Sequence, residues 1–186
     1  MTIKSIKTGW TGISAAAGYP QLGDFESIAT VTIGSGGAAN AEFTSIPSTY
    51  QHLQVRCLLL TASANQNVGI RFNSDTGSNY SVHELYGSGS AAGAIGTANT
   101  VFAPGGFTPG ATYPGGFVLD ILDYTNTNKY KTTRTLWGND TNGGGYVGLS
   151  SGAWRNTNAI TSITFYHTNS NNFNQHSHFA LYGIKG

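Results

Sequence analysis

The sequence predicts an all-β protein, a β-sandwich or jelly roll of short antiparallel strands with an extended N-terminal arm. Three observations carry this prediction. Apolar and polar residues alternate in short segments, Gly- and Asn-rich turns separate these segments, and no stretch of length follows the helical period. The chain has 186 residues, of which 39% are hydrophobic and 12% aromatic. A chain of that length and composition is expected to bury one core, so we predict a single domain over residues 25–186.

Charge is scarce in this chain. Charged residues make up 9% of the sequence, against about 25% in a typical soluble domain. The formal net charge is +1, which gives no electrostatic reason to expect a nucleic-acid or membrane partner. No run approaches the roughly 20 apolar residues of a membrane span. A neutral surface with weak colloidal repulsion suits a protein held in a fixed assembly.

The first 24 residues are small, polar and Gly-rich, and they show neither strand nor helix period. We predict that they form an extended arm. Aromatic residues are favoured interface anchors because they bury a large area at low entropic cost. The arm is therefore expected to make the main attachment to a larger particle, through Lys4, Lys7, Trp10 and Tyr19.

The expected strands follow one another at short intervals. Their ranges are 28–33, 41–46, 52–60, 68–73, 80–86, 117–124, 130–137, 145–149, 160–167 and 179–184. Residues 87–116 are rich in Gly and Ala and are predicted to be mostly loop, a length that is uncommon in a compact domain unless it is functional. The last strand runs into the C-terminus and is expected to close the fold.

One hairpin can be set in register around residues 125–129. A five-residue loop there places Tyr124 opposite Tyr130 and Leu122 opposite Thr132. The same register places Asp120 opposite Arg134, which predicts a cross-strand ion pair.

A second hairpin is predicted around residues 61–66. It aligns Val55, Cys57 and Leu59 with the apolar positions of the next strand, but it also sets Arg56 opposite Arg71. Facing like charges need an anion between them. We therefore predict a structural ion cluster of Arg56, Arg71, Asp120 and Arg134, with an anionic or sugar ligand on the arginines as the alternative.

Nothing in the sequence is arranged for catalysis. Asp120 and Asp123 fall on opposite faces of one strand, which is wrong for a pair of acids acting on one bond. Cys57 stands alone in an apolar run and is expected to be a small buried residue. We predict no enzyme activity and no catalytic residue.

No cofactor or metal site is predicted either. Asp140 lies in an Asn- and Gly-rich turn that offers calcium a single carboxylate, so a plain turn is favoured. His176 and His178 share a strand face and His167 lies upstream, but no cysteine or carboxylate is adjacent to complete a zinc site.

Five segments carry a resemblance to a known group of proteins. They are FESIATVTIGSGGA (25–38), FTSIPSTYQHLQVR (43–56), RFNSDTGSNY (71–80), DILDYTNTNK (120–129) and the terminal FALYGIKG (179–186). Together they resemble virion-associated structural proteins of tailed bacteriophages, over roughly residues 25–186. The group supplies no catalytic residue to carry over.

This resemblance implies a capsid decoration (cement) protein. Such proteins are compact β-modules, usually homotrimers, that bind where subunits of the major capsid protein meet. The chain is then expected on the virion surface. Its first residues lack the apolar core of a signal peptide, so synthesis is expected in the host cytoplasm.

A module of the phage tail or fibre that binds host glycan is the alternative. Its support is a set of residues suited to stacking and hydrogen bonding: Tyr86, Phe107, Tyr113, Trp154 and Asn156.

Overall fold

A computed structural model describes residues 24–186, and these residues form twelve β-strands and no helix. The strands are Phe25–Thr32 (β1), Asn40–Phe43 (β2), His52–Leu59 (β3), Ala64–Phe72 (β4), Tyr80–Gly87 (β5), Ala92–Thr100 (β6), Ala103–Pro109 (β7), Gly115–Leu122 (β8), Lys131–Asp140 (β9), Gly145–Trp154 (β10), Ile163–His167 (β11) and His178–Ile184 (β12). The all-β prediction is confirmed. The arm contacts Lys4, Lys7, Trp10 and Tyr19 lie outside the described residues.

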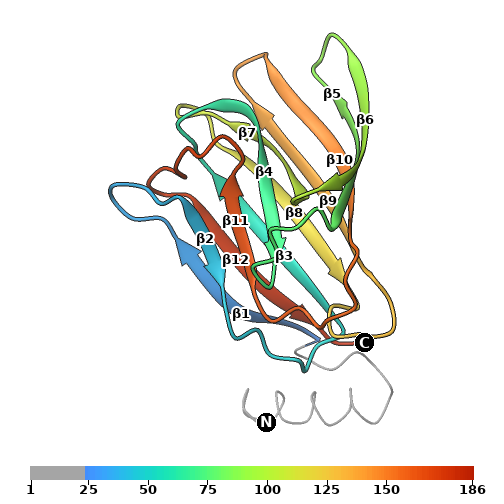
Figure 1. Cartoon of the computed structure of the whole chain (residues 1–186). Helices are drawn as coiled ribbons and strands as arrows, with labels where there is room; N and C mark the ends of the chain where they lie inside the picture. The colour runs from blue at the N-terminus through green and yellow to red at the C-terminus, as the bar shows by residue number, and fades with distance from the viewer. Residues whose placement is uncertain (1–23) are drawn as a thin grey trace, which may run out of the picture.

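The strands form two antiparallel sheets that pack face to face as a β-sandwich. The larger sheet has the order β1-β12-β3-β8-β9-β10-β5-β6, and the smaller has the order β2-β11-β4-β7. Figure 1 shows the smaller sheet lying over the larger one, with the β5–β6 hairpin at one side of the molecule. The last strand, β12, is confirmed as a strand, and it lies inside the larger sheet between β1 and β3.

The core fills the space between the sheets. Leu53, Val55, Cys57 and Leu59 alternate along β3 and are all buried, as expected for one face of a strand. Burial raises the pKa of the Cys57 thiol, which behaves as a small apolar side chain. Phe165 of the smaller sheet packs 5.2 Å from Phe179 of the larger one, measured between ring centroids, and so joins the two layers.

The predicted hairpin between β3 and β4 is wrong. β3 pairs with β12 and β8, whereas β4 pairs with β11 and β7 in the other sheet. The apolar positions of β3 and β4 do face a common core, but from opposite layers of the sandwich. Period-2 alternation identifies a buried face equally well in both arrangements, so it does not distinguish a neighbour in the sheet from one across the core.

The hairpin between β8 and β9 has the predicted register. Leu122 is opposite Thr132, and Asp120 is opposite Arg134. The length of the loop was enough to predict the register, because a short connection between two antiparallel strands fixes which residues face each other.

The prediction of a long loop over residues 87–116 is also wrong. This segment contains β6, β7 and the start of β8. Apart from Ile95, β6 consists of small or polar residues, and seven of its nine residues are exposed, so it has no apolar alternation to recognise. β7 is buried despite its Pro and Gly content. Gly106 of β7 has φ +93°, and a Cβ there would lie 2.3 Å from Cγ of Trp137, so the indole packs directly on backbone.

Candidate protein-docking face

The predicted ion cluster does not form. Arg56, Asp120 and Arg134 lie on the larger sheet and Arg71 lies on the smaller one. None of the ion pairs among residues 24–186 joins any two of these four. The Asp120 carboxylate instead accepts a hydrogen bond from Gln54 Nε2 at 2.9 Å, and Gln54 Oε1 accepts one from Arg56 Nε at 3.0 Å.

Aromatic rings take the place of the expected anion. The Arg56 guanidinium lies 5.3 Å from the ring centroid of Phe25 and 5.7 Å from that of Tyr182, two rings that stack on each other. The Arg71 guanidinium lies 4.2 Å from the ring centroid of Tyr166. Cation–π contacts therefore hold both arginines at the surface, where neither charge needs a carboxylate. The rings belong to strands distant in sequence, which is why local pattern did not find them.

Three of the residues considered for metal binding have structural partners, and the expected shared strand face of His176 and His178 is wrong, because His176 lies in the turn before β12. The His167 ring is buried and lies 3.3 Å from the Ser63 carbonyl, and Nδ1 of His178 lies 3.2 Å from the Thr32 hydroxyl. Asp140 caps its own turn, accepting hydrogen bonds from the backbone amides that follow it. Residues 24–186 contain no group of three or more His, Cys, Asp or Glu side chains placed to hold a metal ion.

The five residues proposed for glycan stacking do not form a platform. Trp154 is buried in the core. Tyr86 and Phe107 are partly buried against each other, 5.5 Å apart between centroids. Asn156 caps a turn by accepting the Asn158 amide, which leaves Tyr113 as the one exposed ring of the set.

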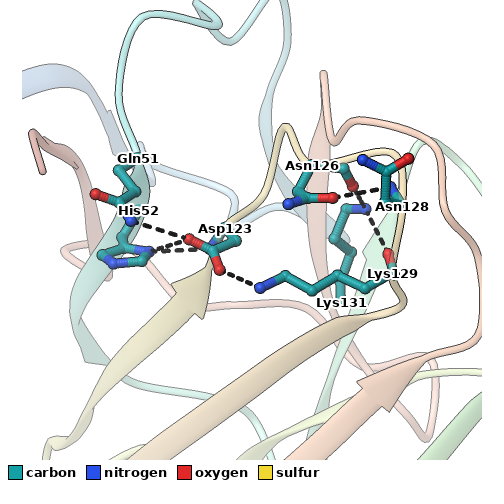
Figure 2. A network of polar contacts seen from close by, with 7 residues as sticks. All are labelled: Gln51, His52, Asp123, Asn126, Asn128, Lys129 and Lys131. Atoms are coloured by element: carbon teal, nitrogen blue, oxygen red, sulfur yellow. Dashed lines mark hydrogen bonds and ion pairs between the residues drawn. The ribbon is translucent and has the colours of Figure 1, made fainter.

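A polar network fastens the β8–β9 loop to the rest of the molecule (Figure 2). Asp123 pairs with Lys129 and lies 3.4 Å from Nδ1 of His52. The hydrogen bond from Lys129 holds the pKa of Asp123 below its usual value. Lys131 is fully buried, and its ammonium donates to the backbone carbonyls of Asn126 and Lys129. Each charged group in this network is engaged in holding the loop, so the network reads as structural.

The outer face of the larger sheet carries a feature that the sequence analysis missed. Val118, Leu136, Leu149 and Leu85 stand directly opposite one another on four successive strands. We call them the leucine row. The three leucines are 54–62% exposed. Each belongs to a strand that the sequence predicted, but pairing across strands is what gathers them into one line.

The next line of residues on the same face is lower at its centre, because two of its members are glycines. Leu58, Gly116, Gly138 and Val147 are successive cross-strand neighbours. Because the two central residues have no side chain, Leu58 and Val147 flank a floor of bare backbone. An open groove of ≈ 550 Å³ lies here, bounded on its other side by the loop at residues 143–145. We call it the glycine groove.

Charged residues border the apolar part of this face: Arg56 continues the leucine row opposite Val118, Asp140 lines the glycine groove, and a polar line runs on the other side of the row. Gln54, Asp120, Arg134, Ser151 and His83 form that polar line, again as successive cross-strand neighbours. An uncharged apolar zone bordered by polar groups is the anatomy of a protein interface. Leu58, Leu85, Leu136, Val147 and Leu149 together expose an apolar patch on the order of 500 Å², at the upper end for a single chain.

Comparisons with models of known protein families, with curated proteins and with solved structures find no match for this chain. The described residues contain no helix long and apolar enough to cross a membrane. The fold and the face define a β-sandwich with an exposed apolar patch on the outer face of its larger sheet, and this patch is the candidate docking surface.

Proposed function

We propose that this chain is a non-enzymatic structural protein of a tailed-phage virion, a capsid decoration protein that binds the major capsid protein through the outer face of its larger sheet. The observation that carries the proposal is the leucine row beside the glycine groove. The choice of a tailed-phage virion as the particle rests on the resemblance of five sequence segments to phage virion proteins. The homotrimer that this resemblance implies is part of the proposal.

The chemistry of the face favours a protein partner over a glycan. Sugars are bound by aromatic rings and converging hydrogen-bonding groups, whereas the leucine row is aliphatic and so are Leu58 and Val147, the two side chains that flank the floor of the glycine groove. The aromatic set that supported the glycan alternative is dispersed, with Trp154 in the core. Aliphatic side chains on a rigid sheet suit burial against another protein because the surface needs little reordering on binding.

The size of the face fits one partner contact. A stable interface buries about 800 Å² per partner, so the apolar patch with its polar border on Arg134 and Asp120 is of the required scale. Burying such a face at many capsid positions adds interface between neighbouring subunits and so strengthens the shell. The arm residues Lys4, Lys7, Trp10 and Tyr19 are proposed as a second contact with the same capsid.

The test is binding to purified capsids that lack the protein, followed by co-sedimentation. Leu136→Asp places a charge in the middle of the leucine row, where its side chain is 60% exposed, so folding is expected to be retained. We expect capsid affinity to fall by about thirtyfold or more, the scale of an interface hot spot. Tyr130→Asp is the matched control, because Tyr130 is 58% exposed but lies in the β8–β9 loop.

Copy number in the virion tests the placement. Quantitative densitometry of purified particles should give hundreds of copies for a decoration protein. A few to dozens of copies would place the chain in the tail instead. Equal capsid binding by Leu136→Asp and the unaltered chain would overturn the role of the outer face.

A further inference from the structure

β6 is an open edge of the larger sheet. It is the last strand in the sheet order, and among the described residues it pairs only with β5. Seven of its nine residues are exposed, and it contains no charged residue and no proline. A strand of this kind presents a row of unpaired backbone amides and carbonyls.

The other three sheet edges carry features that discourage pairing with another strand. β1 has a register shift between Ser27 and Ala29 and carries Glu26 in an ion pair with Lys185. β2 is four residues long, and one of them is an acid. β7 contains two prolines, which cannot donate a hydrogen bond. Short length, charge, proline and bulges are how proteins block edge pairing. β6 is nine residues long and has neither charge nor proline, and its one register shift, at Asn99, lies outside the stretch from Ala92 to Ala98.

The turn before β6 establishes which of its backbone groups are free. The Ser88 amide donates to the Ala91 carbonyl at 2.9 Å across a two-residue loop in which Gly89 has φ +84°. This closing pair is hydrogen-bonded, and hydrogen-bonded pairs alternate with open ones along an antiparallel ladder. Residues in the open pairs direct both backbone groups away from β5. Counting along the register, these residues are Ala92, Ala94, Gly96 and Ala98.

These four residues are the smallest types available. Their side chains fall on one face of the sheet, where a methyl group or a hydrogen does not obstruct an approaching strand. The side chains on the opposite face include Ile95, which is exposed although it is the one large apolar residue of the strand. Both features favour a further strand beside β6.

We propose that β6 pairs antiparallel with β6 of a second copy of this chain, about a two-fold axis at Ile95. With this axis, Ala94 faces Gly96 of the other copy and Ala92 faces Ala98. All four free-edge residues then form hydrogen-bonded pairs, giving on the order of eight backbone hydrogen bonds. The two copies of Ile95 meet at the axis in an open pair, where side chains approach most closely.

A second copy is the occupant that this edge fits best. An isologous contact requires a surface that is complementary to itself, and the free-edge residues of β6 match one another when the strand is reversed. The absence of charge on β6 removes like-charge repulsion at the axis. The pairing does not use the leucine row, so it does not depend on the proposed function, and it can link single chains or trimers.

Cysteine cross-linking of the full chain tests the register directly. At the axis the two Cα atoms of Ile95 would be about 4.5 Å apart, within the range that a disulfide spans. Ile95→Cys should give a covalent dimer on mild oxidation. Thr97→Cys is the matched control on the same face of β6, because its two copies would lie about 13 Å apart along the strands. The native Cys57 is buried and gives little background.

Sedimentation equilibrium then tests the pairing without a cross-link. Ala94→Pro removes an amide that points away from β5, so β6 itself should remain. By symmetry it removes two intermolecular hydrogen bonds, and we expect the dissociation constant of the dimer to rise about tenfold or more. Leu85→Lys places a charge one strand further in, on the leucine row, and should leave the dimer largely intact.

The outcomes separate this inference from the proposed function. Loss of capsid binding in Leu85→Lys with an intact dimer supports both. The edge pairing is overturned if Ile95→Cys cross-links no better than Thr97→Cys. It is equally overturned if Ala94→Pro associates like the unaltered chain, or if residues 1–23 or a capsid protein occupy the edge.

Discussion

The hydroxyl of Ser150 lies 3.3 Å from the carboxylate oxygen Oε1 of Glu84, in the interior of the sandwich behind the leucine row. The Trp137 indole donates to the same hydroxyl at 2.8 Å. Burial raises the pKa of Glu84, and the hydrogen bond from Ser150 opposes that shift only in part. An acid on β5 is therefore kept next to the docking face in an environment that disfavours its charge.

The first expected result concerns pH. A carboxyl whose pKa is higher in the folded state stabilises the fold below its unfolded pKa and loses that contribution as the pH rises through the folded value. The unaltered chain should lose stability on this account as the pH rises from about 4.5, the usual value for Glu. Glu84→Gln should flatten this decline and raise the unfolding free energy at pH 7 by on the order of 1 kcal/mol.

Urea unfolding at a series of pH values measures this difference. Glu42→Gln is the control, because Glu42 is exposed on the smaller sheet. A slope with pH that is the same in Glu84→Gln and in the unaltered chain would show that Glu84 is not the group responsible.

The second result concerns the contact between Gly106 and Trp137. Gly106→Ala should destabilise the protein by about 3 kcal/mol, since the new Cβ would meet the indole at 2.3 Å and the backbone has φ +93°. Gly36→Ala is the matched control, because Gly36 has φ +92° and open space around it. It should cost about 1 kcal/mol, the backbone component alone. Equal losses of melting temperature in the two variants would mean that the indole moves aside without cost.

The sequence predicted strands and register correctly where these are determined by contacts between residues close together in the chain. The alternation of Leu53, Val55, Cys57 and Leu59 identified a buried strand face, and the short loop before Tyr130 identified the register of Asp120 with Arg134. It failed where the partner is distant. The sheet to which β4 belongs is decided by pairing with β11, about 90 residues later, and no local pattern specifies that choice.

The docking face shows the same limit. Leu136 and Leu149 are ordinary outward positions on their own strands, and single exposed leucines carry no information. They gain meaning only when the β8-β9-β10-β5 order places them in one line. Arg56 was read as needing an anion because its aromatic neighbours Phe25 and Tyr182 come from the two ends of the domain.

The last result concerns the buried Lys131 in the network of Figure 2. Its ammonium donates to backbone carbonyls, including Thr157 at 3.0 Å, and so ties the β8–β9 loop to the segment after β10. Lys131→Met keeps the length of the side chain but leaves these carbonyls without their donor. We expect a loss of about 2–4 kcal/mol in unfolding free energy, since several buried acceptors lose their partner at once.

Lys129→Met is the matched control two residues away, where an exposed lysine pairs with Asp123. Its loss should stay below about 1 kcal/mol, as for other surface ion pairs. Chemical denaturation of the two variants at neutral pH measures both values. If Lys129→Met proved the more damaging change, the ion pair with Asp123 would be the main fastening of the loop, and the buried ammonium would contribute little to it.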